Sequence, residues 1–169
     1  MNMSSVAGLL IMIVSEAATL ARIEPFWSWN TPVAWTGFII FADGIVWGAR
    51  GDSWIRSSPR ELLFLAVASI PLWLVFELYN RFIDNWYYVG LPQNAALRYF
   101  GYGWSFATIW PAIFEGAELI GVWRGEGRRP QEGRDQDRID AGPAGAPDFS
   151  PRSWLSVAIG AAMLTWPLA

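Results

Sequence analysis

Four apolar runs, each about long enough to cross a bilayer, constrain the fold of this chain more than any other feature. They cover residues 4–23, 32–49, 61–82 and 99–123, and a fifth run starts at residue 153. About 20 helical residues span a hydrocarbon core of about 30 Å, because each residue adds about 1.5 Å. The sequence therefore predicts an all-α, polytopic transmembrane helix bundle of about five membrane helices.

The composition agrees with this fold class and removes several kinds of chemistry. Apolar residues make up 53% of the 169 residues and charged residues only 16%, which is outside the usual balance of soluble domains. The chain has no cysteine and no histidine, so we predict no disulfide, no thiolate nucleophile and no metal site. All basic residues are arginines, which excludes a lysine Schiff base. We predict no cofactor, and the net charge of -3 argues against a nucleic-acid partner.

The distribution of arginines predicts the orientation of the chain. Residues 50–60 and 124–152 contain nine arginines, whereas the opposite side has only Arg22, Arg81 and Arg98. By the positive-inside rule, those two segments and the N-terminus are cytoplasmic, which suits a multi-pass protein of a bacterial inner membrane.

The same composition divides the chain into three parts. Residues 1–123 are predicted to form a four-helix transmembrane bundle. Residues 124–152 are predicted to form a disordered cytoplasmic loop, because so few apolar residues cannot offset the chain entropy. Residues 153–169 are predicted to form a fifth transmembrane helix, which we expect to be cut short.

Residues between the runs predict how the helices connect. Pro25 and the two tryptophans that follow it predict an interfacial turn over residues 24–30. Residues 50–60 are predicted to form a solvated loop, and residues 85–96 an interfacial loop or a shallow re-entrant turn. A cleaved signal peptide is the alternative for the first run, but Glu16 interrupts its apolar core, so we favour a retained helix.

Two short patterns bear on helix packing and on internal symmetry. Gly44-x-x-x-Gly48 is a spacing that lets two membrane helices approach closely. Arg50-Gly51-Asp52 is echoed by Arg124-Gly125-Glu126, and Ser58-Pro59-Arg60 by Ser150-Pro151-Arg152. These echoes have two interpretations: they are coincidence, or the chain is a truncated protein built from two parallel two-helix repeats.

The acids within the apolar runs are the first candidates for chemistry. They are Glu16, Asp43, Glu77, Glu115 and Glu118. The two arginines in the predicted spans, Arg22 and Arg81, lie at span ends, so we expect no basic counter-ion inside the membrane. An ionised acid at mid-membrane costs about 2.5–3.5 kcal/mol on insertion scales, so we expect protonated carboxylic acids. We expect Asp43, Glu77 and Glu115 to line one cavity. The alternative is that these acids only hydrogen-bond to helix backbones or to each other.

Two helical faces place polar and aromatic side chains together. Trp73, Glu77, Asn80 and Asp84 are three or four residues apart and share one face, and Ser105, Thr108, Glu115 and Glu118 form a second. Aromatic faces beside a proton donor stabilise a carbocation, whereas interfacial anchoring is the alternative role. The aromatic set proposed to contact a substrate, together with Asp43, is Trp73, Trp86, Tyr87, Tyr88, Tyr102, Trp104 and Trp110.

One family shares part of this pattern, at Glu77, Trp86-x-Tyr88, Gly90, Pro92 and Glu115. Over residues 32–123 the chain resembles the small integral-membrane lycopene cyclase domain, and it is similar to uncharacterised bacterial multi-pass membrane proteins. The resemblance implies an integral membrane fold that acts on a long isoprenoid. In the cyclase family an acidic pair follows the proline region, where this chain has Gln93-Asn94.

The sequence leads to one main functional hypothesis. It is an intramembrane cavity for an isoprenoid or other membrane lipid, in an acid-catalysed cyclase or isomerase. Glu77 or Glu115 would donate the proton, Asn80 would orient the acid, and the aromatic rings would shield the cation. The alternatives are a non-enzymatic lipid-binding or assembly subunit, as a homo- or hetero-oligomer, and a proton-coupled transporter.

Overall fold

Residues 2–125 are described by the computed structural model, and within this range all regular structure is helical. The helices are α1 (Met3–Leu20), α2 (Phe26–Arg50), α3 (Trp54–Ser57), α4 (Pro59–Ile83) and α5 (Ala95–Trp123). Three of them, α1, α2 and α4, are long and apolar enough to cross a membrane. The all-α, polytopic prediction is therefore confirmed. Apart from residues 124 and 125, the predicted loop and the fifth helix lie outside the described residues.

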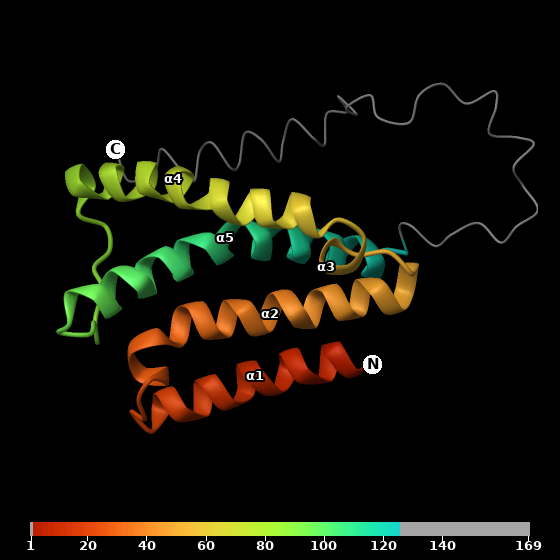
Figure 1. The fold of residues 1–169 in the computed structure, drawn as a ribbon, viewed down its shortest axis with the longest axis horizontal. Helices are drawn as coiled ribbons and strands as arrows, with labels where there is room; N and C mark the ends of the chain where they lie inside the picture. The colour runs from red at the N-terminus through yellow and green to blue at the C-terminus, as the bar shows by residue number, and fades with distance from the viewer. Residues whose placement is uncertain (1, 126–169) are drawn as a thin grey trace, which may run out of the picture.

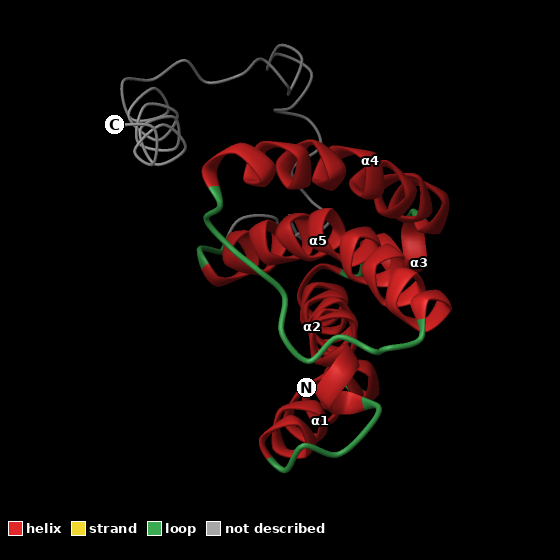
Figure 2. Cartoon of the chain, turned by 90° about the vertical axis from the view of Figure 1, so that its left-hand side faces the viewer, coloured by secondary structure: helices red, strands yellow, loops and turns green. Residues whose placement is uncertain are grey.

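The four long helices lie side by side in the order α1, α2, α5, α4, as Figures 1 and 2 show. Helix α5 is therefore enclosed by two candidate membrane spans. A bilayer that α2 and α4 cross must also contain α5. Helix α5 is not itself a candidate span, because its tyrosines, tryptophans, glycines and glutamates lower its mean hydropathy. Its position between α2 and α4 explains how a long helix that is not itself a candidate span fits into such a bundle.

The two ends of the bundle differ in what they carry. The N-terminus, α3 and the last turn of α5 lie at one end, which we call the α3 end (Figure 1). The turn at residues 21–25 and the connection 84–94 lie at the opposite end, which we call the loop end. This alternation matches the predicted order of connections along the chain.

Glycines allow the close contact between α1 and α2. A Cβ atom on Gly8 would lie 2.3 Å from the backbone nitrogen of Phe41, and one on Gly44 would lie 2.6 Å from that of Ser5. Gly37, two helical turns before Gly44, also faces α1. Gly48 has no atom nearer than 3.8 Å. The predicted glycine pair is thus half right, because the second close approach is at Gly37.

Three predicted boundaries are corrected by the structure. Helix α2 begins at Phe26, so the predicted turn over residues 24–30 is wrong for its last five residues. Pro25 lies immediately before the first residue of the helix and does not shift its start toward residue 32. Pro32 lies inside the helix, where it lacks an N–H donor, and the helix is kinked one turn earlier, at Trp29, with φ -123° and ψ 29°. The predicted loop 50–60 contains α3, and α5 begins at Ala95 rather than at Tyr99.

A buried serine joins α4 to α5. The hydroxyl of Ser69 donates a hydrogen bond to the carbonyl oxygen of Phe106 and accepts one from the backbone N–H of Trp110 at 3.2 Å. In a regular helix these two backbone groups would bond to each other, so the hydroxyl is inserted into the ladder of α5. Pro111 follows immediately, which helps to open the ladder there. On the other side, the indole N–H of Trp104 donates to the Thr36 hydroxyl of α2 at 3.1 Å.

Candidate functional site

A cavity of about 400 Å³ lies between α2, α4, α5 and the connection 84–94, toward the loop end. We call it the aromatic cavity, and its walls include Trp29, Trp35, Trp73, Tyr88, Tyr102 and Phe106. Its volume falls within the range of about 300–1,000 Å³ that is typical of small-molecule sites. Sequence reasoning placed three of these six residues in a site, namely Trp73, Tyr88 and Tyr102.

One stripe of α5 forms the long wall of the aromatic cavity. Arg98, Tyr102, Ser105, Ile109 and Ile113 all line it, at intervals of three or four residues along one helical face. The first and last of these residues are 15 positions apart, which is about 22 Å along the helix. The cavity is therefore elongated, with a charged residue at the loop end and isoleucines deeper in the bundle.

Glu77 holds part of the cavity wall without lining the cavity itself. Its Oε1 accepts hydrogen bonds from the indole N–H groups of Trp73 at 3.0 Å and Trp86 at 3.3 Å, and from the hydroxyl of Tyr88. Burial and the hydrogen bond to Glu77 raise the pKa of Tyr88 to about 12. Glu77 is thus an acceptor that fixes three aromatic side chains, two of which face the cavity.

Asn80 acts on the connection rather than directly on Glu77. Its side-chain oxygen accepts hydrogen bonds from the backbone N–H groups of Asn85 at 2.9 Å and Trp86 at 3.1 Å. Its side-chain nitrogen donates to the carbonyl oxygen of Trp86 at 2.8 Å. Asn80 is linked to Glu77 only through Trp86, whose indole donates to the acid, and the orienting role of Asn80 stays a prediction. Asp84 takes no part in this network; it ends α4 with φ 53°.

The remaining predicted aromatic residues do not line the aromatic cavity. Trp86 lies behind Trp73, with ring centres 6.3 Å apart. Trp104 packs on Trp29 at 6.2 Å, and Trp110 packs on Phe114 at 6.2 Å. The side chain of Tyr87 is 86% exposed.

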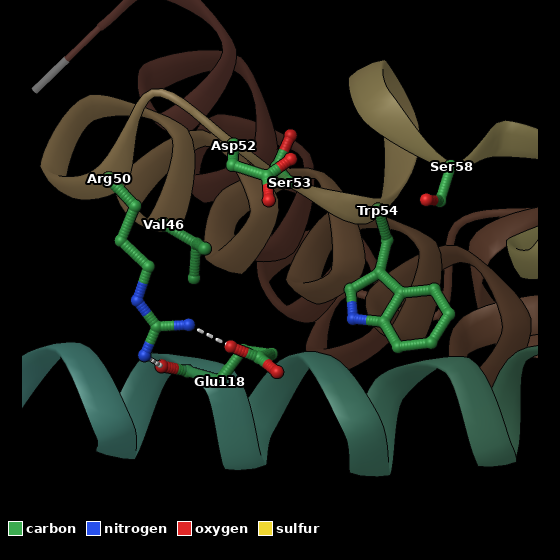
Figure 3. Close-up of a pocket in the computed structure, with 7 residues that line it drawn as sticks. All are labelled: Val46, Arg50, Asp52, Ser53, Trp54, Ser58 and Glu118. Carbon is green, nitrogen blue, oxygen red and sulfur yellow. Dashed lines mark hydrogen bonds and ion pairs between the residues drawn. The ribbon is translucent and has the colours of Figure 1, made fainter. Parts of the chain in front are cut away.

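Two of the predicted acids are paired at the α3 end. Buried Asp43 accepts hydrogen bonds from the backbone N–H of Ile55 at 2.8 Å and from the guanidinium of Arg56 at 2.7 Å. Figure 3 shows the second pair, Arg50 of α2 with Glu118 of α5, bordering a cleft of about 270 Å³. The expectation that these acids lack basic counter-ions is wrong, because α3 and the end of α2 bring arginines back onto the bundle.

Glu115 differs from the paired acids. It is fully buried, and neither carboxyl oxygen has a hydrogen-bond partner among residues 2–125. It lies on α5 beyond the deep end of the aromatic cavity and does not line it. Among the described residues, Asp43, Glu77 and Glu115 therefore do not share a cavity, and that expectation is also wrong.

Sequence reasoning missed the contribution of α2 to the site. Trp29 and Trp35 line the aromatic cavity, and the indole N–H of Trp29 is buried against Gly101 without an acceptor within residues 2–125. The predicted turn had assigned Trp29 to the interface, so its inward position was not expected. The periodicity of Arg98 to Ile113 was a usable signal, because these residues share one face of a helix.

Comparison with protein-family models, curated proteins and solved structures found no match. The resemblance to the lycopene cyclase domain therefore stays a prediction, and the function has to be argued from the geometry of the site.

Proposed function

We propose that this membrane protein binds an isoprenoid or another long-chain lipid in the aromatic cavity. The observation that carries the proposal is the cavity itself, about 400 Å³ in volume and walled by aromatic and aliphatic side chains from three helices. Such walls favour an apolar ligand, because enclosing it removes apolar surface from contact with water and fills an otherwise empty space. Ile113 is half-exposed at the deep end, so a chain can enter sideways from the bilayer.

The location we propose is a bacterial inner membrane, with the α3 end and the N-terminus in the cytoplasm. Support comes from the unequal distribution of arginines, since residues 50–60 at the α3 end and the segment after α5 hold nine of the twelve. The loop end then faces outward, and the aromatic cavity opens near the outer leaflet.

Filling the cavity tests the proposed function. Ser105→Phe adds a ring to the middle of the cavity wall, whereas Ala117→Phe adds the same ring to an exposed position of the same helix. We expect wild type and Ala117→Phe to carry about one lipid per chain after purification in detergent, and Ser105→Phe to lose it. The measurement is solvent extraction followed by mass spectrometry. An unchanged lipid content in well-folded Ser105→Phe would contradict the proposal.

A second candidate function is acid-catalysed isomerisation or cyclisation of a polyene in the same cavity. It is favoured by the contact between Glu77 and Tyr88, because the Tyr88 side chain reaches both the carboxyl group and the cavity. Because Glu77 does not line the cavity, the Tyr88 hydroxyl would give its proton to one carbon of an alkene and take a proton from Glu77. The resulting carbocation would lie next to aromatic rings, and a different C–H would return a proton to Glu77 along the same path. This sequence is balanced without an oxidant, a reductant or another reactant.

Glu77→Gln tests the second candidate, because an amide keeps an oxygen acceptor for the three aromatic donors but cannot deliver a proton. In a lycopene-accumulating host, a catalytic Glu77 predicts cyclised or isomerised pigment with wild type and unchanged lycopene with Glu77→Gln. Folded yield in detergent is the control. Unchanged pigment with well-folded wild type would reject the isomerase and leave lipid binding in place.

A further inference from the structure

The aromatic cavity has a single charged residue in its lining, and that residue is at one end. Arg98 borders the cavity beside the connection 84–94, whereas the other lining residues are apolar, aromatic or hydroxyl-bearing. Arg98 forms no ion pair with any residue in the range 2–125, and its guanidinium carbon lies 5.9 Å from the ring centre of Tyr99. A partly buried cation at the edge of an apolar cavity favours a ligand with a negative charge at that point.

The position of Arg98 fits the orientation of a lipid. It belongs to the first turn of α5 at the loop end, where side chains reach the headgroup level, and Ile113 lies about 22 Å further along the helix. A volume of about 400 Å³ spread over this length is a narrow channel that suits one chain. The polar end and the apolar end of the cavity are thus arranged as in one amphiphile.

The number of cations selects among anionic head groups. One guanidinium matches the single charge of a carboxylate and binds it through two parallel hydrogen bonds. A phosphate monoester carries about 1.5 to 2 negative charges, and Arg98 is the one cation that borders the aromatic cavity within the described residues. The cavity therefore favours a carboxylate over a phosphate monoester.

We propose that the ligand of the aromatic cavity is a single-chain carboxylic acid, with its carboxylate at Arg98 and its chain directed toward Ile113. This inference rests on the proposed lipid-binding function and names the class of ligand. It also gives Arg98 a specificity-determining role that sequence reasoning did not assign.

Retinoic acid and retinol are a matched pair of probes, since they share one isoprenoid chain and differ in the head group. Both quench tryptophan fluorescence by energy transfer, and Trp29, Trp35 and Trp73 line the cavity. Binding would be measured with the full chain in neutral phosphatidylcholine nanodiscs at mildly alkaline pH. The variants are Arg98→Gln and, as the matched control, Arg22→Gln, which changes an arginine at the same end that contacts Trp27 and not the cavity.

We expect wild type and Arg22→Gln to bind retinoic acid about 10- to 100-fold more tightly than retinol. Arg98→Gln should lower the affinity for the acid to that for the alcohol and leave retinol binding unchanged, which also shows that the variant is folded. Equal, saturable binding of both probes to wild type, or no effect of Arg98→Gln, would overturn the carboxylate inference and leave lipid binding intact. Absence of saturable binding of either probe would overturn both proposals.

Discussion

Asp43 and Glu115 are both buried acids, yet the structure predicts opposite effects of removing them. Asp43 is 1% exposed and accepts from the Ile55 N–H and Arg56, so Asp43→Ala leaves a partly buried backbone donor without an acceptor and Arg56 without its ion-pair partner. Breaking a buried ion pair costs about 3–5 kcal/mol of unfolding free energy. Because the Arg56 side chain is 30% exposed and can be solvated after the pair is broken, we expect Asp43→Ala to lower the unfolding free energy by about 3 kcal/mol. Glu115 has two oxygens without partners among residues 2–125, a state that costs about 1–3 kcal/mol.

Glu115→Met therefore should stabilise the protein by about 1–3 kcal/mol, because the flexible side chain of methionine fills the space without a polar group. The assay is unfolding in mixed detergent micelles with increasing dodecyl sulfate, followed by tryptophan fluorescence. We expect the midpoint to shift upward for Glu115→Met and downward for Asp43→Ala. A downward shift of similar size for both variants would refute the reasoning and show that Glu115 has a partner, such as a buried water or a ligand.

Three further predictions concern packing, pH and topology. Gly44→Leu should separate α1 from α2 and lower the unfolding midpoint strongly. Gly48→Leu should have little effect, because a Cβ at Gly48 would meet only the Asn2 side chain, at 3.8 Å; equal effects of the two variants would contradict the observed contact. Because the pKa of Tyr88 is raised, the contribution of the Tyr88 hydroxyl to stability is present below about pH 10 and is lost between about pH 10 and 12. Tyr88→Phe should therefore remove a late step from the ultraviolet titration of tyrosinate. An unchanged titration would contradict this. Reporter fusions after Ile55 and Gly90 should read cytoplasm and exterior, respectively, and the reverse result would reject the proposed orientation.

The fold class was predictable because a bilayer imposes a length on apolar helices. The runs at residues 4–23, 32–49 and 61–82 correspond to α1, α2 and α4, with boundaries shifted by at most six residues. The largest shift is at the start of α2, where a proline was interpreted as a stop although Phe26 begins the helix directly after it. A proline changes local geometry, and only the packing around it decides between a break and a kink.

The candidate site was only partly predictable because it depends on which helices are neighbours. The predicted face of α4 grouped Trp73, Glu77 and Asn80, which the structure links through Trp86, because that grouping needs only the period of a helix. It also included Asp84, which ends the helix outside this network. The pairing of Asp43 with Arg56 depends on a short helix returning to the bundle, which the spacing of apolar residues does not encode.

The position of α5 between α2 and α4 had the largest consequence for the site. It brings Trp29 and Trp35 of α2 opposite the stripe that begins at Arg98. A single sequence without the spatial order of its helices cannot assign these walls to one cavity.

The central claim is that a lipid chain lies along α5 inside the aromatic cavity, and photocrosslinking with a diazirine-bearing isoprenoid acid tests it directly. Cleavage after arginine separates residues 61–81, which carry the exposed apolar face of α4, from residues 99–124, which carry the cavity stripe of α5. The account predicts saturable labelling at Ile109 or Ile113, competed by the unlabelled acid and lost in Ser105→Phe. Labelling spread over residues 61–81, with no competed label on residues 99–124, would contradict it.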